Sequence, residues 1–257
     1  MHRVILVACL FAAAGMGADG KSQPQDAAKV FIGNILPQIA VGGAWSTEIQ
    51  LMNARFDDEA ESYTIRFLDE SGNEMTLPVV GQGMRTSVSG VVQPRGAVFF
   101  ELAGGPNTLV GIALAESGTS GGVVMNAVLT QKVAGRPDFQ ASVPSTDRFG
   151  TNFQFPYRND GPYTTTAAFV SNAAQTLTVI ARDANGLELC RVGRQMTFGQ
   201  HVSFLVSDPA WLPCTADRQG VIEIVPAEGG SGTMIAFLFN DQGAFTTQLP
   251  FEISPDP

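Results

Sequence analysis

The sequence predicts an all-β protein built of two tandem antiparallel β-sandwich domains, each of immunoglobulin-like size. Three observations lead to this prediction. One order of turns and apolar strands occurs twice, and 28 glycines and 15 prolines among 257 residues favour turns. Apolar residues at helical spacing extend over no more than about two turns. A jelly roll, or one sandwich shared by both copies, is the alternative.

Each copy starts with a proline, a turn of small residues, an aromatic residue and a pair of hydroxyl residues. The first copy has Pro37, Trp45 and Ser46-Thr47, and the second has Pro156, Tyr163 and Thr164-Thr165. An apolar strand follows each aromatic, and a hairpin turn comes next, at 69–73 and at 183–186. The second turn ends in Asn-Gly, which is typical of a tight hairpin.

The correspondence continues to the end of each copy. Glycine turns at 94–96 and 198–200 lead into apolar strands at 97–102 and 201–206. Two further strands follow in each copy, separated by turns at 116–122 and 228–232. We therefore assign the repeats to 30–135 and 151–257. The polar segment 136–150, which contains two prolines, is assigned to a linker.

The beginning of the chain predicts export. A short positive head with His2 and Arg3 precedes an apolar stretch over 4–14, and the small residues Gly15, Gly17 and Ala18 offer a cleavage site. Residues 1–18 are therefore predicted to be a signal peptide and 19–29 a polar N-terminal segment. The apolar run is shorter than the roughly 20 residues that cross a bilayer. We expect a secreted or periplasmic protein with no transmembrane segment in its mature chain.

Cysteine usage fits export. A lipoprotein-like box ends at Cys9, but this cysteine lies too near the start for lipidation to be favoured, and it leaves with the signal peptide. The mature chain keeps Cys190 and Cys214, and a pair in an oxidising compartment predicts one disulfide. Two buried free thiols are the alternative.

Charge argues against one class of partner. The chain has 15 basic and 24 acidic side chains, a formal net charge of -9, and no basic cluster. Neutralising phosphates requires a basic surplus, so we expect no nucleic-acid partner. A protein or an extracellular glycan is the expected kind of partner.

Two features resemble catalytic chemistry, and neither is assigned to it. Residues 118–122 match the G-x-S-x-G spelling of a nucleophile elbow, which needs a helix after the serine. Here an apolar strand follows, so a hairpin tip is predicted. His201 is the one histidine of the mature chain and starts an apolar strand, so we assign it a structural role. The sequence thus predicts no catalytic residue and no enzyme.

Two acidic segments are candidates for calcium sites. Asp57, Asp58, Glu59 and Glu61 form one, and Asp69, Glu70 and Asn73 form the other. Neither has the spaced loop pattern of a calcium site, so a solvated loop and a hairpin turn are predicted. We expect no metal and no cofactor. No pair of carboxylates is singled out for glycoside hydrolysis, whose geometry depends on the fold.

Three aromatic residues are the candidate ligand contacts: Trp45, Tyr163 and Trp211. Exposed flat rings can stack on sugar faces, and binding sites commonly combine aromatic walls with a few polar groups. Trp45 and Tyr163 occupy equivalent places in the two copies, so a core role is the favoured interpretation for them. Trp211 lies in a loop of the second copy beside Cys214, where packing against the disulfide is the alternative.

Three stretches of the sequence carry a resemblance that covers most of the mature chain: Leu36-Pro37 with 42–47, then 135–139, and 243–246. Through them the chain resembles a group of uncharacterised exported two-repeat proteins of soil bacteria. It implies an extracytoplasmic β protein and supplies no activity and no site residues.

From these observations we expect an exported, non-catalytic protein with a structural, adhesive or partner-binding role. Its edge strands offer a place for another chain to add a strand. A carbohydrate-binding accessory module is the alternative, and a hydrolase that uses acidic residues is a third hypothesis.

Overall fold

The computed structural model describes residues 33–253, which are all-β apart from one short 3-10 helix. The predicted signal peptide and polar segment lie outside the described residues. The strands of the first half are β1 (Asn34–Val41), β2 (Trp45–Asn53), β3 (Glu61–Leu68), β4 (Leu77–Val79), β5 (Gly83–Arg85), β6 (Ser87–Val92), β7 (Ala97–Ala103), β8 (Leu109–Ser117), β9 (Val123–Gln131) and β10 (Phe139–Pro144).

The second half contains nine strands and the 3-10 helix. They are β11 (Phe153–Arg158), β12 (Thr164–Ser171), β13 (Gln175–Asp183), β14 (Glu188–Met196), β15 (His201–Leu205), η1 (Pro213–Thr215), β16 (Gln219–Pro226), β17 (Gly232–Phe239), β18 (Phe245–Gln248) and β19 (Phe251–Glu252). Residues 33–253 include no helix with the length and apolar character that a membrane crossing requires.

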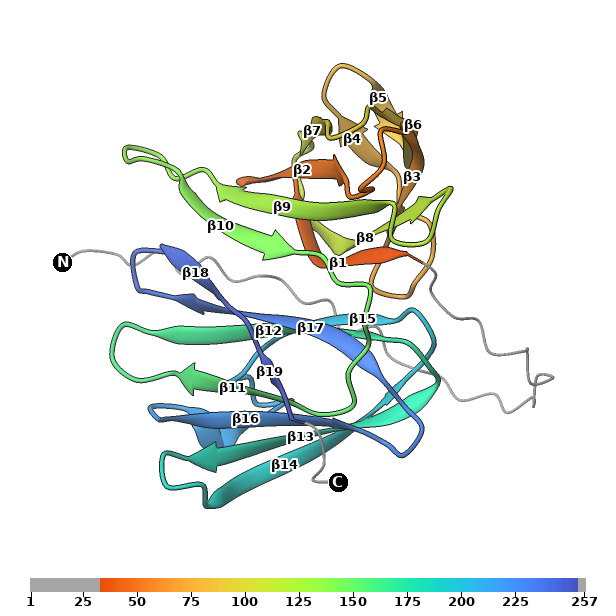
Figure 1. The fold of residues 1–257 in the computed structure, drawn as a ribbon. Helices are drawn as coiled ribbons and strands as arrows, with labels where there is room; N and C mark the ends of the chain where they lie inside the picture. The colour runs from red at the N-terminus through yellow and green to blue at the C-terminus, as the bar shows by residue number, and fades with distance from the viewer. Residues whose placement is uncertain (1–32, 254–257) are drawn as a thin grey trace, which may run out of the picture.

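Four antiparallel sheets are formed, two in each half (Figure 1). The first half has a four-stranded sheet, β1-β8-β3-β6, and a six-stranded sheet, β10-β9-β2-β7-β4-β5. The second half has a five-stranded sheet, β14-β13-β16-β11-β19, and a four-stranded sheet, β15-β12-β17-β18. The all-β class predicted from the sequence is confirmed.

The two halves share a strand order. β1-β8-β3-β6 corresponds to β11-β16-β13-β14, and β10-β9-β2-β7 corresponds to β18-β17-β12-β15. What differs is the β4–β5 hairpin of the first half, and the loop with η1 and the strand β19 of the second. The turns that the sequence aligns therefore lie at corresponding places in the sheets.

Two polar contacts recur at corresponding positions. The Thr47 hydroxyl bonds both backbone groups of Ala40, accepting at 3.1 Å and donating at 2.7 Å. The Thr165 hydroxyl does the same with Arg158, at 2.8 and 3.0 Å. Each buried threonine therefore fastens the first two strands of its half. Satisfying backbone groups where the strands separate removes the cost of burying them unpaired.

The hairpin turns also recur. The Asp69 carboxylate accepts bonds from the backbone N–H groups two and four residues later, and Asp183 does the same in the second half. Such aspartate turns satisfy backbone donors locally. Gly72 and Gly186 have φ angles of 80° and 85°, which suit glycine in these turns.

The segment assigned to a linker, 136–150, contains β10. This strand pairs with β9 as an edge of the six-stranded sheet, with Phe139 opposite Gln131 and Pro144 opposite Asn126. Val143 is fully buried and Phe139 packs against the core of the first half. The alternation of Phe139, Ala141 and Val143 produces the strand, and proline is tolerated at its end because β10 is an edge. Only the residues after β10 connect the two halves.

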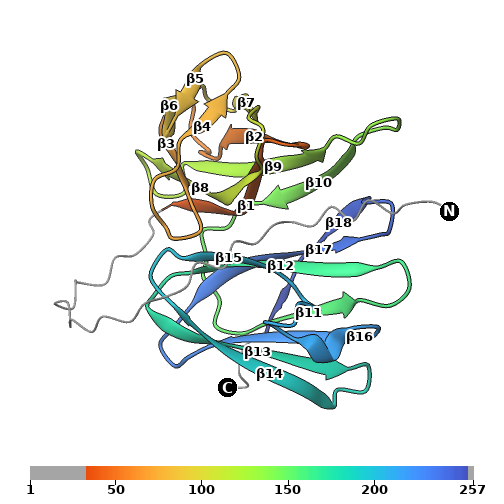
Figure 2. The same cartoon turned by 180° about the vertical axis from the view of Figure 1, so that it is seen from behind.

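The two halves meet in an apolar seam. The second four-stranded sheet turns its outer face toward β1 and β10 of the first half (Figures 1 and 2). Ala168, Ile235, Phe237 and Phe245 of that sheet belong to the same hydrophobic cluster as the core of the first half. Every residue of β1 is buried, since one face of the strand meets its own sandwich and the other meets the second half. The first core therefore continues into the seam, while the second half has a separate core.

The predicted disulfide is present. Cys190 on β14 and Cys214 in η1 are bonded, at a sequence separation of 24. Both cysteines pack against the second core, together with Trp211. In the chain-entropy description, closing a loop of this length stabilises by about 3 kcal/mol.

Removing this disulfide is expected to destabilise the second half selectively. The paired variant Cys190→Ser with Cys214→Ser should lose about 3 kcal/mol in the free energy of unfolding, measured by urea denaturation. Fluorescence of Trp211 should report the loss, because its indole packs against the same core as the two cysteines. A midpoint unchanged from the wild type would contradict this expectation.

Candidate functional site

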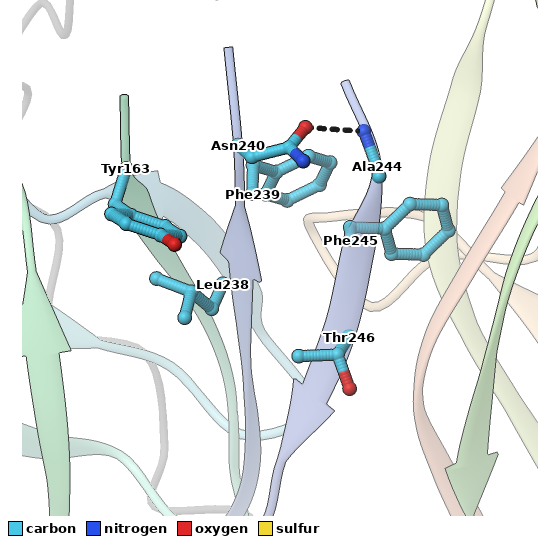
Figure 3. Close-up of a pocket in the computed structure, with 7 residues that line it drawn as sticks. All are labelled: Tyr163, Leu238, Phe239, Asn240, Ala244, Phe245 and Thr246. Atoms are coloured by element: carbon cyan, nitrogen blue, oxygen red, sulfur yellow. Dashed lines mark hydrogen bonds between the residues drawn. The ribbon is translucent and has the colours of Figure 1, made fainter. Parts of the chain in front are cut away.

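Three aromatic residues of the second half, Tyr163, Phe239 and Phe245, lie at the end where β17 turns into β18. A hollow of about 220 Å³ opens there. Figure 3 shows its seven lining residues, with Leu238 on the side of Tyr163 and the ring of Phe245 pointing away, toward the strands of the first half. The lining consists of Tyr163, Leu238, Phe239, Asn240, Ala244, Phe245 and Thr246. It is a shallow, largely apolar depression.

Phe245 connects this hollow to Trp45 in the first half. The rings of Trp45 and Phe245 meet edge to face with centroids 5.2 Å apart, and Phe239 stacks on Phe245 at 5.1 Å. These separations are typical of stabilising aromatic pairs. Two of the three candidate aromatics, Trp45 and Tyr163, thus lie on either side of Phe239 and Phe245. Trp45 packs against the first core, in agreement with the core role favoured for it.

The ring of Tyr163 carries a cation on one face. The guanidinium carbon of Arg158 lies 3.8 Å from the ring centroid, and Asp160 accepts a hydrogen bond from Arg158 Nε at 2.9 Å. Such a cation–π contact favours a fixed ring orientation. It also occupies a face that a sugar would need for stacking.

Trp211 is covered from two directions and lies apart from the hollow. Its indole stacks on Phe204 with centroids 4.0 Å apart, and the guanidinium of Arg194 lies 5.0 Å from the ring centroid. Arg194 is itself held by the backbone carbonyl of Ala210. The indole therefore packs against the second core, as Cys190 and Cys214 also do.

The acidic segment before β3 is organised around Arg55. Its guanidinium reaches Asp57, Glu59 and Glu61 at 2.5, 3.1 and 3.2 Å. Burial alone would raise the pKa of Glu61, but hydrogen bonds from Arg55 and Thr119 outweigh burial and hold it below its ordinary value. The Arg55 guanidinium therefore occupies the position between these carboxylates that a metal ion would need. Within residues 33–253, no group of three or more acidic, histidine or cysteine side chains has the geometry of a metal site.

Glu61 ties β3 to the tip that resembles a nucleophile elbow. Its carboxylate accepts a hydrogen bond at 3.1 Å from the backbone N–H of Thr119, and Arg55 donates to the Thr119 hydroxyl. The turn at 118–122 connects β8 of the four-stranded sheet to β9 of the six-stranded sheet, and these two strands do not pair, so the prediction of a hairpin tip is wrong. Ser120 lies in this turn between sheets, and a strand rather than a helix follows it. Gln175 holds the corresponding tip of the second half through the carbonyl of Ser231, at 2.7 Å. Both glycine-rich tips are thus fastened to the sandwich by a buried side chain.

His201 lies in the seam, fully buried. Its Nε2 is 3.0 Å from Gln38 Oε1 on β1, and the Ser203 hydroxyl donates to the same oxygen at 3.0 Å. Burial lowers the pKa of His201 to about 4, against the opposing effect of the Pro37 carbonyl. The imidazole is therefore neutral at ordinary pH and joins the two halves through polar contacts.

A second hollow, of about 210 Å³, lies over the start of β3 and the end of β8. Its lining consists of Ser62, Tyr63, Thr64, Glu116, Ser117 and Gly118. Arg66 forms an ion pair with Glu116 at its border. This hollow is more polar than the first, and the Glu116 carboxylate at its border is hydrogen-bonded to Arg66.

One feature was not found from the sequence: the outer face of the six-stranded sheet. Met52 and Phe99 point outward from β2 and β7, and they are 48% and 62% exposed. Half-buried Val124 and Val128 of β9 lie beside them, opposite Met52 and Glu48 in the pairing of β9 with β2. The alternation in each strand could have indicated this face, because Met52 and Phe99 occupy positions that a solvated face fills with polar residues.

The same face carries two carboxylates. Glu48 and Glu101 are directly opposite each other on β2 and β7. Gln50 donates a hydrogen bond to Glu48 at 2.8 Å, and neither glutamate forms an ion pair with a described residue. Like charges opposite each other on a sheet destabilise it slightly. The face thus combines exposed apolar side chains with unneutralised negative charge.

Comparisons of the chain with protein-family models, with curated proteins and with solved structures find no match.

Proposed function

We propose that the chain is an exported, non-catalytic protein whose two tandem sandwich domains, copies of one module, form a structural and partner-binding unit. The duplication is supported by the shared strand order and by the recurring contacts of Thr47 with Ala40 and of Thr165 with Arg158. Export is supported by the disulfide, because such bonds persist in oxidising compartments. The sequence features of residues 1–18 point the same way.

The partner-binding role is carried by one observation, the apolar outer face of the six-stranded sheet. We call the part of this face around Met52 and Phe99 the docking face. An exposed apolar patch rimmed by polar groups is typical of a protein interaction surface. More than half of the surface of Phe99 is exposed to solvent. A polar residue would fit the same position, so the exposed phenylalanine calls for another explanation. The face is also continuous and stiff, because β9, β2 and β7 are paired along their whole length.

The corresponding face of the second half already makes a protein contact. Ala168 and Val170 of β12 occupy the places of Gln50 and Met52 of β2, since the two strands pair with their neighbours in the same order. Both residues are buried in the contact with the first half. A face of this module thus serves as a docking surface within the chain, which supports the same use for the exposed copy.

A photo-crosslinking residue in place of Phe99 tests this function in cells that produce the protein. We expect it to form covalent adducts with another polypeptide, because the side chain lies within the docking face. The matched control places the crosslinker at Phe56, which is fully exposed in the loop before β3. Equal adduct yields at both positions, or none at Phe99, would contradict the proposal.

The carbohydrate-binding alternative is less well supported. It needs free aromatic faces, and Arg158 covers one face of Tyr163 while Phe204 and Arg194 flank Trp211. The hydrolase alternative needs two carboxylates in one cleft. The acidic segment before β3 instead holds its carboxylates on Arg55.

A further inference from the structure

The seam between the two halves is almost free of ionisable groups. Across it β1 and β10 of the first half contact β12, β17 and β18 of the second half, and β15 reaches β1 through His201 and Gln38. These six strands, all within the described chain, contain no lysine, arginine, aspartate or glutamate, so His201 is their only side chain that changes charge near neutral pH. A change of charge inside the seam therefore falls on this imidazole.

The surroundings of the imidazole suit its neutral form. Gln38 Oε1 on β1 lies 3.0 Å from Nε2 and is an acceptor, so Nε2 carries the single proton of the neutral ring. Nδ1 is buried and has no hydrogen-bond partner among the described residues. Protonation adds an N–H at Nδ1, and a buried N–H without an acceptor is costly, the more so on a charged ring.

The first half brings three carboxylates to the neighbourhood of His201, on the turn at 69–74. The Glu70 carbonyl accepts a hydrogen bond from the backbone N–H of His201 at 3.0 Å, and the Asp69 carboxylate accepts bonds from its own turn. Glu74 ends this turn. β12, which pairs with β15 through Val170 and His201, has no titratable side chain. Burial and Asp69 raise the pKa of Glu70, so its protonation favours the closed seam and opposes the effect of His201.

We propose that protonation of His201 opens the seam between the two halves while both sandwiches stay folded. Each half has its own pair of sheets, and the second half has a separate core, so the seam can part without unfolding either sandwich. Opening brings the charged imidazole into water, while the residues after β10 keep the halves tethered. It also exposes the apolar face of β12 and β17 that carries Ala168 and Phe237. At neutral pH these apolar contacts hold the seam closed.

The size of the effect follows from the two environments of the ring. The pKa of His201 is about 4 in the closed seam, and an imidazole in water titrates near 6.5. Above pH 6.5 the ring is neutral in both states, so pH has little effect on opening. Between pH 6.5 and pH 4 the open state binds a proton that the closed state does not. The ratio of open to closed molecules should therefore rise roughly 100-fold from pH 7.5 to pH 4.5.

Single-tryptophan proteins measure this opening. Trp45 meets Phe245 across the seam, whereas Trp211 packs against the second core. At pH 7.5 both fluorescence signals should change at one urea concentration. At pH 4.5 the Trp45 signal should change at a lower urea concentration than the Trp211 signal. Between the two transitions, far-UV circular dichroism should keep its folded value while the radius of gyration from X-ray scattering rises.

Three variants decide whether the imidazole is responsible. His201→Gln does not titrate in this range, so its two transitions should coincide at pH 4.5. Gln38→Glu has nearly the same shape and places a carboxylate beside Nε2, so an ion pair forms as the ring takes up a proton. Its Trp45 transition should move to higher urea from pH 8.5 to pH 5.5, opposite to the wild type. Glu70→Gln removes the opposing titration and should widen the separation at pH 4.5.

Coincident transitions in the wild type at pH 4.5, or an equal separation in His201→Gln, would overturn the proposal. Loss of circular dichroism together with the Trp45 change would also overturn it, because the first sandwich would then be unfolding. If His201→Gln does not fold at pH 7.5, Gln38→Glu decides alone, and a Trp45 transition that moves to lower urea in acid would count against the imidazole. The docking face is not involved in any of these outcomes, because Met52 and Phe99 are exposed outside the seam.

Discussion

Replacing Phe237 with alanine is expected to lower the free energy of unfolding by about 3–5 kcal/mol, the usual cost of removing a buried phenylalanine. Phe237 lies on the outer face of β17, is 5% exposed, and belongs to the cluster that joins the first core to the seam. It meets Phe245 edge to face at 6.1 Å. Its removal leaves a cavity between the halves and weakens the contact through which they stabilise each other.

The two tryptophans allow the effect to be assigned to the seam. Trp45 packs against Phe245 at the seam and Trp211 packs in the second core, so single-tryptophan proteins report the two regions separately. In the wild type we expect both signals to change at one urea concentration, as in a cooperative unit. In Phe237→Ala the Trp45 transition should come first. Coincident transitions with a loss below about 1 kcal/mol would show that the seam carries little stability.

Phe169→Ala is the matched control. Phe169 lies on β12 of the same sheet but points to the second core, where it meets Phe153 at 6.3 Å. Its removal should cost a similar free energy, since both side chains are buried phenylalanines. In this variant the Trp211 fluorescence should change at a lower urea concentration than the Trp45 fluorescence. The order of the two transitions, rather than the total loss, distinguishes a seam residue from a core residue.

The strands could be predicted from local patterns, because glycine, proline and aspartate turns recur at matching places in both halves. β10 escaped prediction because Pro137 and Pro144 bracket it, and prolines near an apolar alternation are equally typical of a linker. The short β4–β5 hairpin has no counterpart in the second copy, so a search for repeats passes over it. In both places the structure depends on pairing with a strand elsewhere in the chain, β9 for β10 and β7 for β4, and local sequence does not show which strand that is.

The candidate residues show the same division. The buried, structural role of His201 fits its apolar strand, but its partner Gln38 is 163 residues away and no pattern connects them. Trp45 and Tyr163 were paired by repeat position, yet they differ in contacts because Phe245 meets one and Arg158 covers the other. The contacts of Arg55 with three carboxylates of the acidic segment are not indicated by any spacing in the sequence, because they depend on how the loop before β3 folds back on itself.

The sequence could predict which side chains share the docking face, but not whether this face is exposed to solvent or covered. Alternation shows that Met52 and Phe99 share the outward side of neighbouring strands. Whether an outward side faces solvent or another sheet depends on how the halves are joined, and this is a property of the seam. The corresponding Ala168 and Val170 are buried for that reason alone.

Acid is expected to destabilise the protein through His201. The pKa of this imidazole is about 4 in the folded protein, against an ordinary value of 6.5, because burial disfavours the charged form. Above pH 6.5 the group is neutral in both states. As pH falls, the unfolded chain takes up a proton that the folded protein does not, so stability is lost between pH 6.5 and pH 4. A difference of this size corresponds to about 3 kcal/mol.

The comparison of wild type with His201→Gln isolates this contribution. Glutamine keeps a hydrogen-bonding group near Gln38 and Ser203 and has no titration in this range. Glu70 in the adjacent turn also has a shifted pKa, and its backbone carbonyl accepts a hydrogen bond from the backbone N–H of His201 at 3.0 Å. Burial and Asp69 raise the pKa of Glu70, which favours the folded state as pH falls and opposes the histidine effect in both proteins. Urea denaturation at pH 7.5 and pH 4.5 should therefore show a larger loss in the wild type than in the variant. Equal losses would mean that the imidazole is protonated without cost in the seam, and that the contact between the halves accommodates its charge.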